Sequence, residues 1–393
     1  MANYIPFVNG SRDLALCTRF FSDAEITRVP LDVALRYKDR LKSLSGLWLD
    51  ATVDAFEGGP NERWNTYARQ FSGANHIAAV AADQLKPAPK IIQQFVDSVL
   101  DLCLGLSPRW ISVPQLPYRS DSTRNSVNRA LAKAAGTWKS TRSFPGALVL
   151  PVVLRHQDQA NSKTMRKQKI ALATSCFELS GSASCWVVES SLRDWEGSGN
   201  FATKRFPGVI AFHEELRSDL AKTGSRAFVI GGPYWALNLV LWARGAIDCP
   251  AIGVGGGFQY FLRSGVAQTP SARIALGPLR RLARAGADLR VWLSEAAKVG
   301  GPAAPTFRHL SRELQRTAHD ENAGRSQIAQ FYKAWFDQIA SAKPTGRALA
   351  LFQDFSAAYV LGKSVSALLP AAEAPARRPE RIAEQMMLQC LSG

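Results

Sequence analysis

The sequence predicts an α/β protein, a closed (β/α)8 barrel of the TIM type followed by a helical extension. Two apolar runs that end in glycines, AFVIGGP and AIGVGGG, flank the run LNLVLWA. This pattern is typical of two buried strands joined by a crossover helix. Roughly eight such strand candidates alternate with helical segments, which favours closure into a barrel over the alternative of an open doubly wound sheet. From residue 306 onward, apolar residues recur only at helical spacing.

The individual elements follow from apolar runs bounded by glycine, proline or polar residues. The opening run NYIPFVNG is expected to be a short strand at the bottom of the barrel, outside the eight. Residues 31–44 and 64–104 show helical spacing, and 126–140 form a basic amphipathic helix. Residues 1–300 are assigned to the barrel and 306–393 to a helical C-terminal extension. The eight strands are expected at 46–56, 109–118, 147–156, 185–190, 208–215, 227–233, 251–257 and 272–278.

The composition indicates a globular protein of the cytoplasm. A chain of 393 residues with 46% hydrophobic content can bury a large core. The six cysteines are scattered without a CxxC pair, which argues against a disulfide framework or a zinc site and favours a reducing compartment. No apolar run approaches ~18 residues and no signal peptide pattern opens the chain, so we expect no membrane association. Neither a cofactor nor an oligomeric state is indicated.

Basic residues are concentrated in two segments of the chain. The formal net charge is +16, and residues 119–170 hold 11 Lys and Arg against two Asp, a net charge of +9. Residues 263–290 hold six Arg and one Asp, a net charge of +5. Clusters of this size are typical of proteins that bind nucleic acid, although a solvated basic surface without a ligand is the alternative. The candidate phosphate contacts are Arg124, Arg129, Lys133, Lys139, Arg142, Lys163, Arg166 and Lys167.

Polar residues at the carboxyl ends of barrel strands are candidates for the active site, because those ends form the catalytic face of a (β/α)8 barrel. Asp50 and Glu189 each follow an apolar run and are the candidate catalytic carboxylates, with Asp54 as a further one; capping or turn roles are the alternative. His213 and the glutamates after it lack the spacing of a zinc site, so no metal is predicted. The candidate substrate contacts by the same rule are Gln115, Arg119, Arg155, His156 and His213.

The segment Gly256-Gly257-Phe258-Gln259 suits recognition of a planar heterocycle, because glycines allow close approach, Phe offers a stacking face and Gln a donor and an acceptor. It resembles the GGFQ segment by which tRNA-guanine transglycosylases hold their base. Those enzymes are barrels that exchange a base in nucleic acid through an aspartate attacking the anomeric carbon. Val254-Gly255 stands where the family has Asp-Ser, the motif lies late in the chain, and the Cys/His zinc site of the family is absent. The resemblance therefore implies a diverged relative, similar to the barrels proposed for antiphage DNA glycosylases.

The expected function is cleavage of the N-glycosidic bond of a base in DNA, with a modified base favoured and a role in antiphage defence expected. Asp50 would attack or stabilise the cationic C1′ and Glu189 would act as acid or base, as paired carboxylates do in glycoside hydrolysis. One alternative is base exchange on tRNA or DNA. A second is a barrel enzyme that binds a small phosphorylated metabolite at the glycine loops, and a third is a nucleic-acid-binding scaffold without activity.

Overall fold

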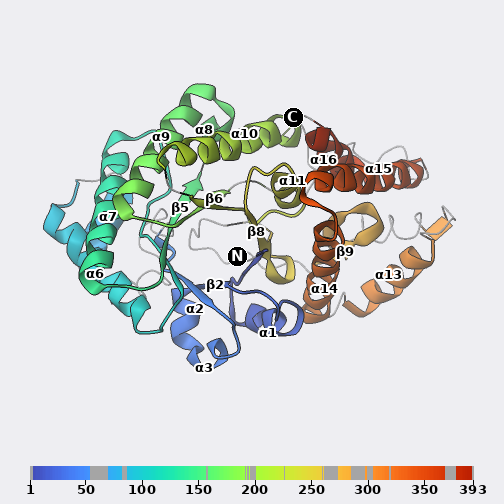
Figure 1. Cartoon of the computed structure of the whole chain (residues 1–393). Helices are drawn as coiled ribbons and strands as arrows, with labels where there is room; N and C mark the ends of the chain where they lie inside the picture. The colour runs from blue at the N-terminus through green and yellow to red at the C-terminus, as the bar shows by residue number, and fades with distance from the viewer. Residues whose placement is uncertain are drawn as a thin grey trace.

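The computed structural model describes residues 3–53, 70–81, 86–155, 158–190, 192, 194, 201–224, 226–258, 260, 273–284, 297–298, 304–317, 320–367 and 378–391. Eight strands form a closed barrel in which every strand is parallel to its neighbours and β8 pairs with β1 (Figure 1). The predicted (β/α)8 fold is confirmed. The strands are β1 (Ile5–Phe7), β2 (Thr27–Pro30), β3 (Leu47–Asp50), β4 (Trp110–Ser112), β5 (Ala147–Leu154), β6 (Ser184–Glu189), β7 (Phe228–Gly231) and β8 (Cys249–Gly253).

Six of the predicted strands overlap β3 to β8, but the start of the barrel differs from the prediction. The run NYIPFVNG supplies β1, which lies between β2 and β8 as a full member of the barrel. The sequence prediction missed β2 altogether. Its four residues, TRVP, include a polar and a charged side chain that are both buried, so the apolar signature of a barrel strand is absent.

Two predicted barrel strands are not part of the barrel. Residues 208–215 lie within the long helix α10 (Phe201–Lys222), in which Val209, Phe212 and Leu216 recur at helical spacing and are buried. Residues 272–278 overlap β9 (Arg273–Leu276), which pairs antiparallel with β10 (Arg281–Arg284) in a separate hairpin. A short apolar run does not reveal its partner strand, so the sequence could not separate β9 from a barrel strand.

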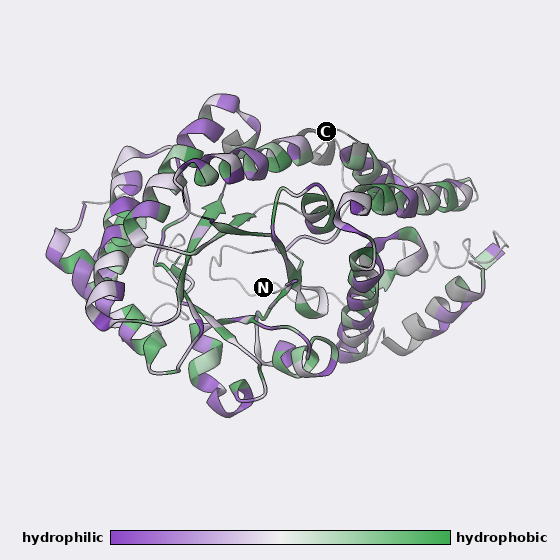
Figure 2. Ribbon diagram, in the orientation of Figure 1, coloured by the Kyte–Doolittle hydropathy of each residue, from purple (hydrophilic) through white to green (hydrophobic). Residues whose placement is uncertain are grey.

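Helices surround the barrel, and a further group of helices comes after β8 in the chain. Those that connect the strands are α1 (Ser11–Phe20), α2 (Leu31–Arg36), α3 (Lys38–Leu41), α5 (Ala74–Ala81), α6 (Pro89–Leu104), α7 (Ser122–Arg142), α8 (Asp158–Asn161), α9 (Lys163–Ser180), α10 and α11 (Leu237–Ala243). After β8 come η2 (Val254–Gly256), the hairpin with η3 (Gly277–Leu279), α13 (Ala304–Thr317), α14 (Glu321–Ala340), η4 (Pro344–Gly346), α15 (Arg347–Ser366) and α16 (Arg381–Leu391). In Figure 2 the barrel strands are mainly hydrophobic, whereas the helices around them carry both kinds of residue.

Helix α14 takes the place of the eighth barrel helix. It lies between α1 and α11 in Figure 1 and contacts α1 and η2. Tyr332, Trp335 and Phe336 on α14 are buried in the same hydrophobic core as the barrel, and the Tyr332 hydroxyl donates a hydrogen bond of 2.8 Å to the carbonyl of Trp235. The expected division at residues 300 and 306 stays a prediction, but α14 completes the packing of the barrel.

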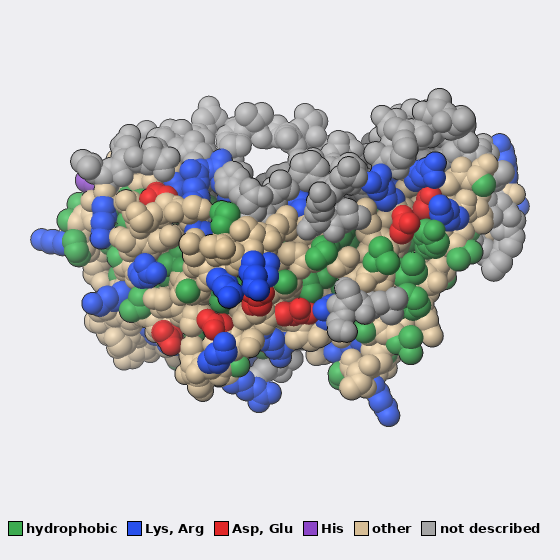
Figure 3. Space-filling model, turned by 90° about the horizontal axis from the view of Figure 1, so that it is seen from above, with side chains coloured by type: hydrophobic (Ala, Val, Ile, Leu, Met, Phe, Trp, Pro, Cys, Tyr) green, Lys and Arg blue, Asp and Glu red, His purple; other side chains and the backbone are tan. Residues whose placement is uncertain are grey.

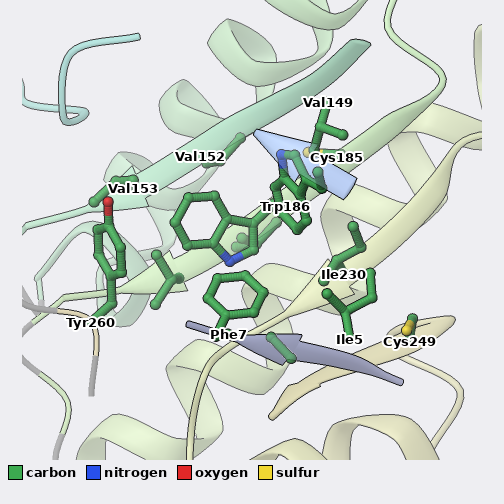
Figure 4. Packing of buried hydrophobic residues seen from close by; sticks show 14 of the residues in the cluster. Ile5, Phe7, Val149, Val152, Val153, Cys185, Trp186, Ile230, Cys249 and Tyr260 are labelled. Carbon is green, nitrogen blue, oxygen red and sulfur yellow. The ribbon is translucent and has the colours of Figure 1, made fainter. Parts of the chain in front are cut away.

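The interior of the barrel is filled with aromatic and branched side chains, some of which Figure 4 shows. The ring of Phe7 lies 5.4 Å from that of Trp48 and 5.2 Å from that of Trp186, measured between centroids. Tyr260, just beyond the glycine loop, packs edge-on against Trp186 at 4.9 Å (Figure 4). The interior of the barrel is therefore a packed core and not a pore.

Candidate active site

Asp50 is the last residue of β3 and its carboxylate forms an ion pair with Arg28 of β2 inside the barrel. Both side chains are buried, with side-chain exposures of 3% and 1%. The Arg28 Nε donates to Asp50 Oδ2 at 2.9 Å and Nη2 donates to the same oxygen. Asp50 follows Trp48 by two residues, and because side chains alternate along a strand, both project into the barrel. The strand-end rule thus placed Asp50 correctly at the carboxyl end.

The Arg28 guanidinium is enclosed by aromatic rings. Its central carbon lies 5.2 Å from the ring centroid of Phe7, 5.7 Å from that of Trp186 and 5.6 Å from that of Tyr260. The remaining guanidinium nitrogen, Nη1, donates to the carbonyl of Val8 at 3.1 Å. Cation–π contacts of desolvated guanidinium groups contribute about 2 kcal/mol or more. Arg28 is thus held by a carboxylate, a carbonyl and three rings.

The backbone directly after Asp50 is strained. Thr52 has a φ of 50°, in the left-handed region that β-branched residues avoid. Its N–H donates to Asp50 Oδ1 at 3.0 Å, so the carboxylate holds the strained turn in place. Strain of this kind costs about 1–3 kcal/mol and is concentrated at functional sites. Asp50 Oδ2 is occupied by Arg28, and Oδ1 accepts this one backbone hydrogen bond among those of the described residues.

Glu189, the last residue of β6, lies on the other face of the sheet. It follows Trp186 by three residues, so it points away from the interior toward the helices. Its Oε2 lies 3.4 Å from Nη2 of Arg205 on α10, and its N–H donates to the Tyr234 hydroxyl at 2.6 Å. Burial raises the pKa of Tyr234, with the Glu189 carboxylate as a further cause. The structure therefore does not bring Asp50 and Glu189 together over one cavity, as the paired-carboxylate hypothesis requires.

The glycine loop after β8 is shaped by packing against α1 and α14. Gly255 has a φ of 60°, and a Cβ there would lie 2.8 Å from Leu16 Cδ1 and 3.2 Å from Arg325 Cβ. Phe258 is fully buried, with its ring 4.8 Å from Trp235 and 4.7 Å from Tyr332. Phe258 is therefore a core residue and cannot stack on a base in this conformation. Of the predicted segment 256–259, Gly256 and Gly257 also belong to this loop, and Gln259 lies outside the described residues.

Tyr260 is the aromatic residue of this segment that faces the candidate site. It is buried, and its ring contacts both Arg28 and Trp186. Sequence reasoning selected Phe258 because it directly follows the glycines. The chain projects Phe258 toward α14 and Tyr260 toward the barrel, and this difference depends on the backbone path of the loop.

The other predicted substrate contacts have structural partners or lie outside the described residues. Gln115 Nε2 donates to the carbonyl of Asn128 at 3.0 Å and so fastens the loop after β4 to α7. The carbonyl of Arg119 accepts a hydrogen bond from the buried Lys169, and burial lowers the pKa of that lysine to about 8. Arg155 directly follows β5 and is half-buried. Asp54 and His156 lie outside the described residues.

His213 lies on α10, not at the end of a strand. Its imidazole is buried, with Nδ1 2.7 Å from the carbonyl of Val209 one turn earlier, so that Nδ1–H donates. Burial lowers the pKa of His213 to about 4, which keeps the ring neutral near pH 7. A Cβ on Gly231 of β7 would lie 3.4 Å from His213 Nε2, so the imidazole packs between helix and sheet. The placement predicted for His213 is wrong because segment 208–215 is helical.

The eight candidate phosphate contacts fall into two groups. Arg124 is fully buried, with Nη2 donating to the carbonyl of Ala81 at 2.6 Å. Lys139 donates to the carbonyl of Gly181, three residues before β6, so it lies at the amino end of the strands. Arg142 lies at the same end and pairs with Asp101 at 2.8 Å. Arg166 pairs with Glu215 at 2.8 Å. The remaining four, which are exposed and have no ion pair to the described residues, are Arg129, Lys133, Lys163 and Lys167.

Asp194 organises the loop after β7, and sequence reasoning missed it. Its carboxylate accepts hydrogen bonds from the N–H groups of Trp235, Ala236 and Leu237, at 2.7–2.9 Å, and so caps the start of α11. Burial raises the pKa of Asp194 to about 6, against the lowering effect of these three donors. An Asp far from the helix it caps has no local sequence signal. Arg28 was missed for a related reason, because a lone Arg in a four-residue strand resembles a loop residue.

Neither protein-family models nor curated proteins provide a match to this chain. The likeness to tRNA-guanine transglycosylases therefore remains a resemblance carried by residues 256–259. Within the described ranges, no helix is long and apolar enough to cross a membrane. The same part of the chain contains no group of three or more His, Cys, Asp or Glu side chains that could hold a metal ion. All six cysteines are free thiols.

Proposed function

We propose that this chain is an enzyme that cleaves the N-glycosidic bond of a base in nucleic acid, with DNA as the favoured substrate. The observation that carries the proposal is Asp50, a buried carboxylate at the carboxyl end of β3, held by Arg28 beside a strained Thr52. Active sites of (β/α)8 enzymes are built at this end of the barrel. A carboxylate that is fixed in a water-poor site can stabilise positive charge that develops on a substrate.

The chemistry assigns one task to Asp50. As the C1′–N bond breaks, its electron pair leaves on the base nitrogen, which takes up a proton, and C1′ becomes cationic. Asp50 Oδ1 stabilises that cation until water adds its oxygen to C1′ and loses a proton. The target nucleotide has to leave the base stack to reach the barrel end. Glu189 has no part in this step, because its carboxylate faces Arg205 on α10.

Four exposed basic residues support nucleic acid as the substrate. Lys163 and Lys167 lie in the first two turns of α9, which follows β5 and the short helix α8, and Arg129 and Lys133 lie on the neighbouring α7. On the face drawn in Figure 3, basic side chains are interspersed with acidic ones, so the net charge of +16 does not form a continuous basic surface there. Phosphate binding through a few defined contacts fits this distribution better than binding over the whole surface.

The alternative of a small phosphorylated metabolite receives less support. It depended on Gly255 to Gly257 as a phosphate cradle. Each glycine there has a structural reason: a Cβ on Gly255 would meet Leu16 and Arg325, Gly256 has a φ of 100°, and a Cβ on Gly257 would lie 2.5 Å from Asn9 Nδ2. Base exchange differs from hydrolysis only in the group that C1′ accepts, which is a second base in place of water. A role in antiphage defence requires that modified phage DNA is the substrate.

The first experiment is mass spectrometry of the small molecules released from unmodified DNA, base-modified phage DNA and tRNA, each with and without an added free base. We expect release of one base by the wild type. Asp50→Glu keeps the charge opposite Arg28 but moves the carboxylate by one methylene, so it should fold and release base at least ~10²-fold more slowly. No release from any substrate, or full activity of Asp50→Glu, would refute the proposal.

The second experiment measures binding of duplex DNA as a function of salt concentration. Four phosphate contacts give a slope of log K against log salt of about −3 to −4. Replacing Arg129, Lys133, Lys163 and Lys167 by Gln should remove most of that slope. The matched control is Lys139→Gln with Arg142→Gln, at the other end of α7, which should leave the slope unchanged. If both sets of substitutions reduced the salt slope equally, DNA would bind without preference for the four proposed residues.

A further inference from the structure

The two oxygens of the Asp50 carboxylate differ in their surroundings. Oδ2 accepts both hydrogen bonds from the Arg28 guanidinium, from Nε and from Nη2. Oδ1 accepts only the N–H of Thr52 among the described residues. A carboxylate oxygen has about two lone-pair sites, so Oδ2 is saturated while Oδ1 retains one.

Arg28 itself has no freedom to release the carboxylate. Phe7, Trp186 and Tyr260 surround the guanidinium, and Val8 O accepts from Nη1. A lysine could neutralise Asp50, but a single ammonium group does not fix the orientation of a carboxylate as a planar guanidinium does.

Stability alone does not explain this arrangement. Replacing a buried ion pair by apolar residues of similar volume is often neutral or stabilising. The pair nonetheless occupies the carboxyl end of β3 in a barrel whose interior is mainly lined by rings and branched side chains. A buried pair at this place, in which one oxygen accepts a single hydrogen bond from the described residues, fits a group held ready for a reaction.

We propose that Arg28 is a positioning residue that binds Asp50 Oδ2 and thereby presents Oδ1 as the oxygen that faces the reacting C1′. This inference rests on the proposed function. Arg28 does not touch the substrate in this scheme. It acts by holding one oxygen so that the other has a single orientation.

The test uses two oligonucleotides that differ in one charge. One carries a neutral tetrahydrofuran nucleotide, and the other a pyrrolidine nucleotide that is cationic like the C1′ transition state. We expect the wild type to bind the pyrrolidine oligonucleotide at least ~10-fold more tightly, because Asp50 Oδ1 faces the cation. Arg28→Lys should keep its affinity for the tetrahydrofuran oligonucleotide, since phosphate contacts are unaltered, but lose most of the preference. Base release by this variant should fall ~10²-fold in kcat with little change in KM.

Several outcomes separate the two proposals. A wild type without preference for the pyrrolidine oligonucleotide overturns the proposed function, and the positioning role of Arg28 with it. A wild-type preference that Arg28→Lys retains together with full kcat leaves the function standing and overturns the role of Arg28. Should Arg28→Lys fail to fold, Tyr260→Leu removes one of the three rings around the guanidinium and leaves the ion pair in place. That variant is expected to lose part of the preference, and an unchanged preference would contradict the proposal.

Discussion

The buried pair of Arg28 and Asp50 makes a strong prediction about stability that is independent of any activity. Asp50→Asn leaves the guanidinium buried without a counter-ion, and Arg28→Met leaves the carboxylate in the same condition. Both side chains are at most 3% exposed, so solvent cannot compensate for the lost charge. Removing one partner of a buried ion pair costs about 3–5 kcal/mol of unfolding free energy. Each single variant should lose that amount.

The double variant Arg28→Met with Asp50→Asn should be more stable than either single variant. It contains no buried charge, and the Asn oxygen can still accept the N–H of Thr52. Replacement of both partners is often close to neutral, so we expect a loss of under about 2 kcal/mol. The interaction free energy of the cycle then amounts to at least about 4 kcal/mol.

Urea unfolding of the four proteins, with reductant for the free thiols, provides the free energies for this cycle. The control cycle uses the pair Arg142 and Asp101, whose side chains are 46% and 41% exposed. An exposed pair contributes about 0–1 kcal/mol, so this cycle should be nearly additive. Additive losses at Arg28 and Asp50 would show that the two charges are not coupled and would remove the structural basis of the candidate site.

Three further predictions concern the fold. Burial lowers the pKa of His213 in the folded protein from 6.5 to about 4. As the pH falls through this window, the unfolded protein binds the proton more tightly, and the free energy of unfolding falls by about 3 kcal/mol in total. His213→Leu should remove this loss of stability in acid. The difference in urea midpoint between variant and wild type should therefore grow from pH 7 to pH 4, and a difference that stays constant over this range would contradict the prediction. Asp354→Ala leaves Arg280 without its carboxylate partner and removes the 2.9 Å hydrogen bond that Trp335 donates. The free energy of unfolding should fall by about 3 kcal/mol, and a loss under about 1 kcal/mol would contradict the prediction. Gly255→Ala would place a Cβ 2.8 Å from Leu16 on a backbone in the left-handed region. The free energy of unfolding should fall by about 2 kcal/mol or more in the same assay. An unchanged urea midpoint would show that α1 moves aside freely.

The sequence predicted the barrel because most of its strands are apolar runs with glycine or polar ends. This signal located β3 to β8, since burial on both faces of a parallel strand requires continuous apolar residues. It failed for β2, where Arg28 occupies an interior position, and for 208–215, where a helix presents a buried face of similar composition. Both failures arise from tertiary context, because the partner of Arg28 is 22 residues away and the partner of α10 is the outside of the barrel.

The candidate site shows a second limit of sequence reasoning, which concerns the two faces of a strand. Asp50 and Glu189 each end an apolar strand and are equivalent by the rule of carboxyl ends. The alternation of side chains separates them, because Asp50 lies two residues after an interior Trp and Glu189 lies three residues after another. A mechanism with two carboxylates at one cavity therefore conflicts with the alternation of side chains along β6. If Asp50 acts alone on the cationic carbon, the proton for the departing base has to come from another group or from water, and the enzyme should prefer bases that leave readily. Comparing release rates for a series of bases that differ in leaving-group acidity tests this: a steep dependence is expected, and equal rates would point to a protein acid beside Asp50.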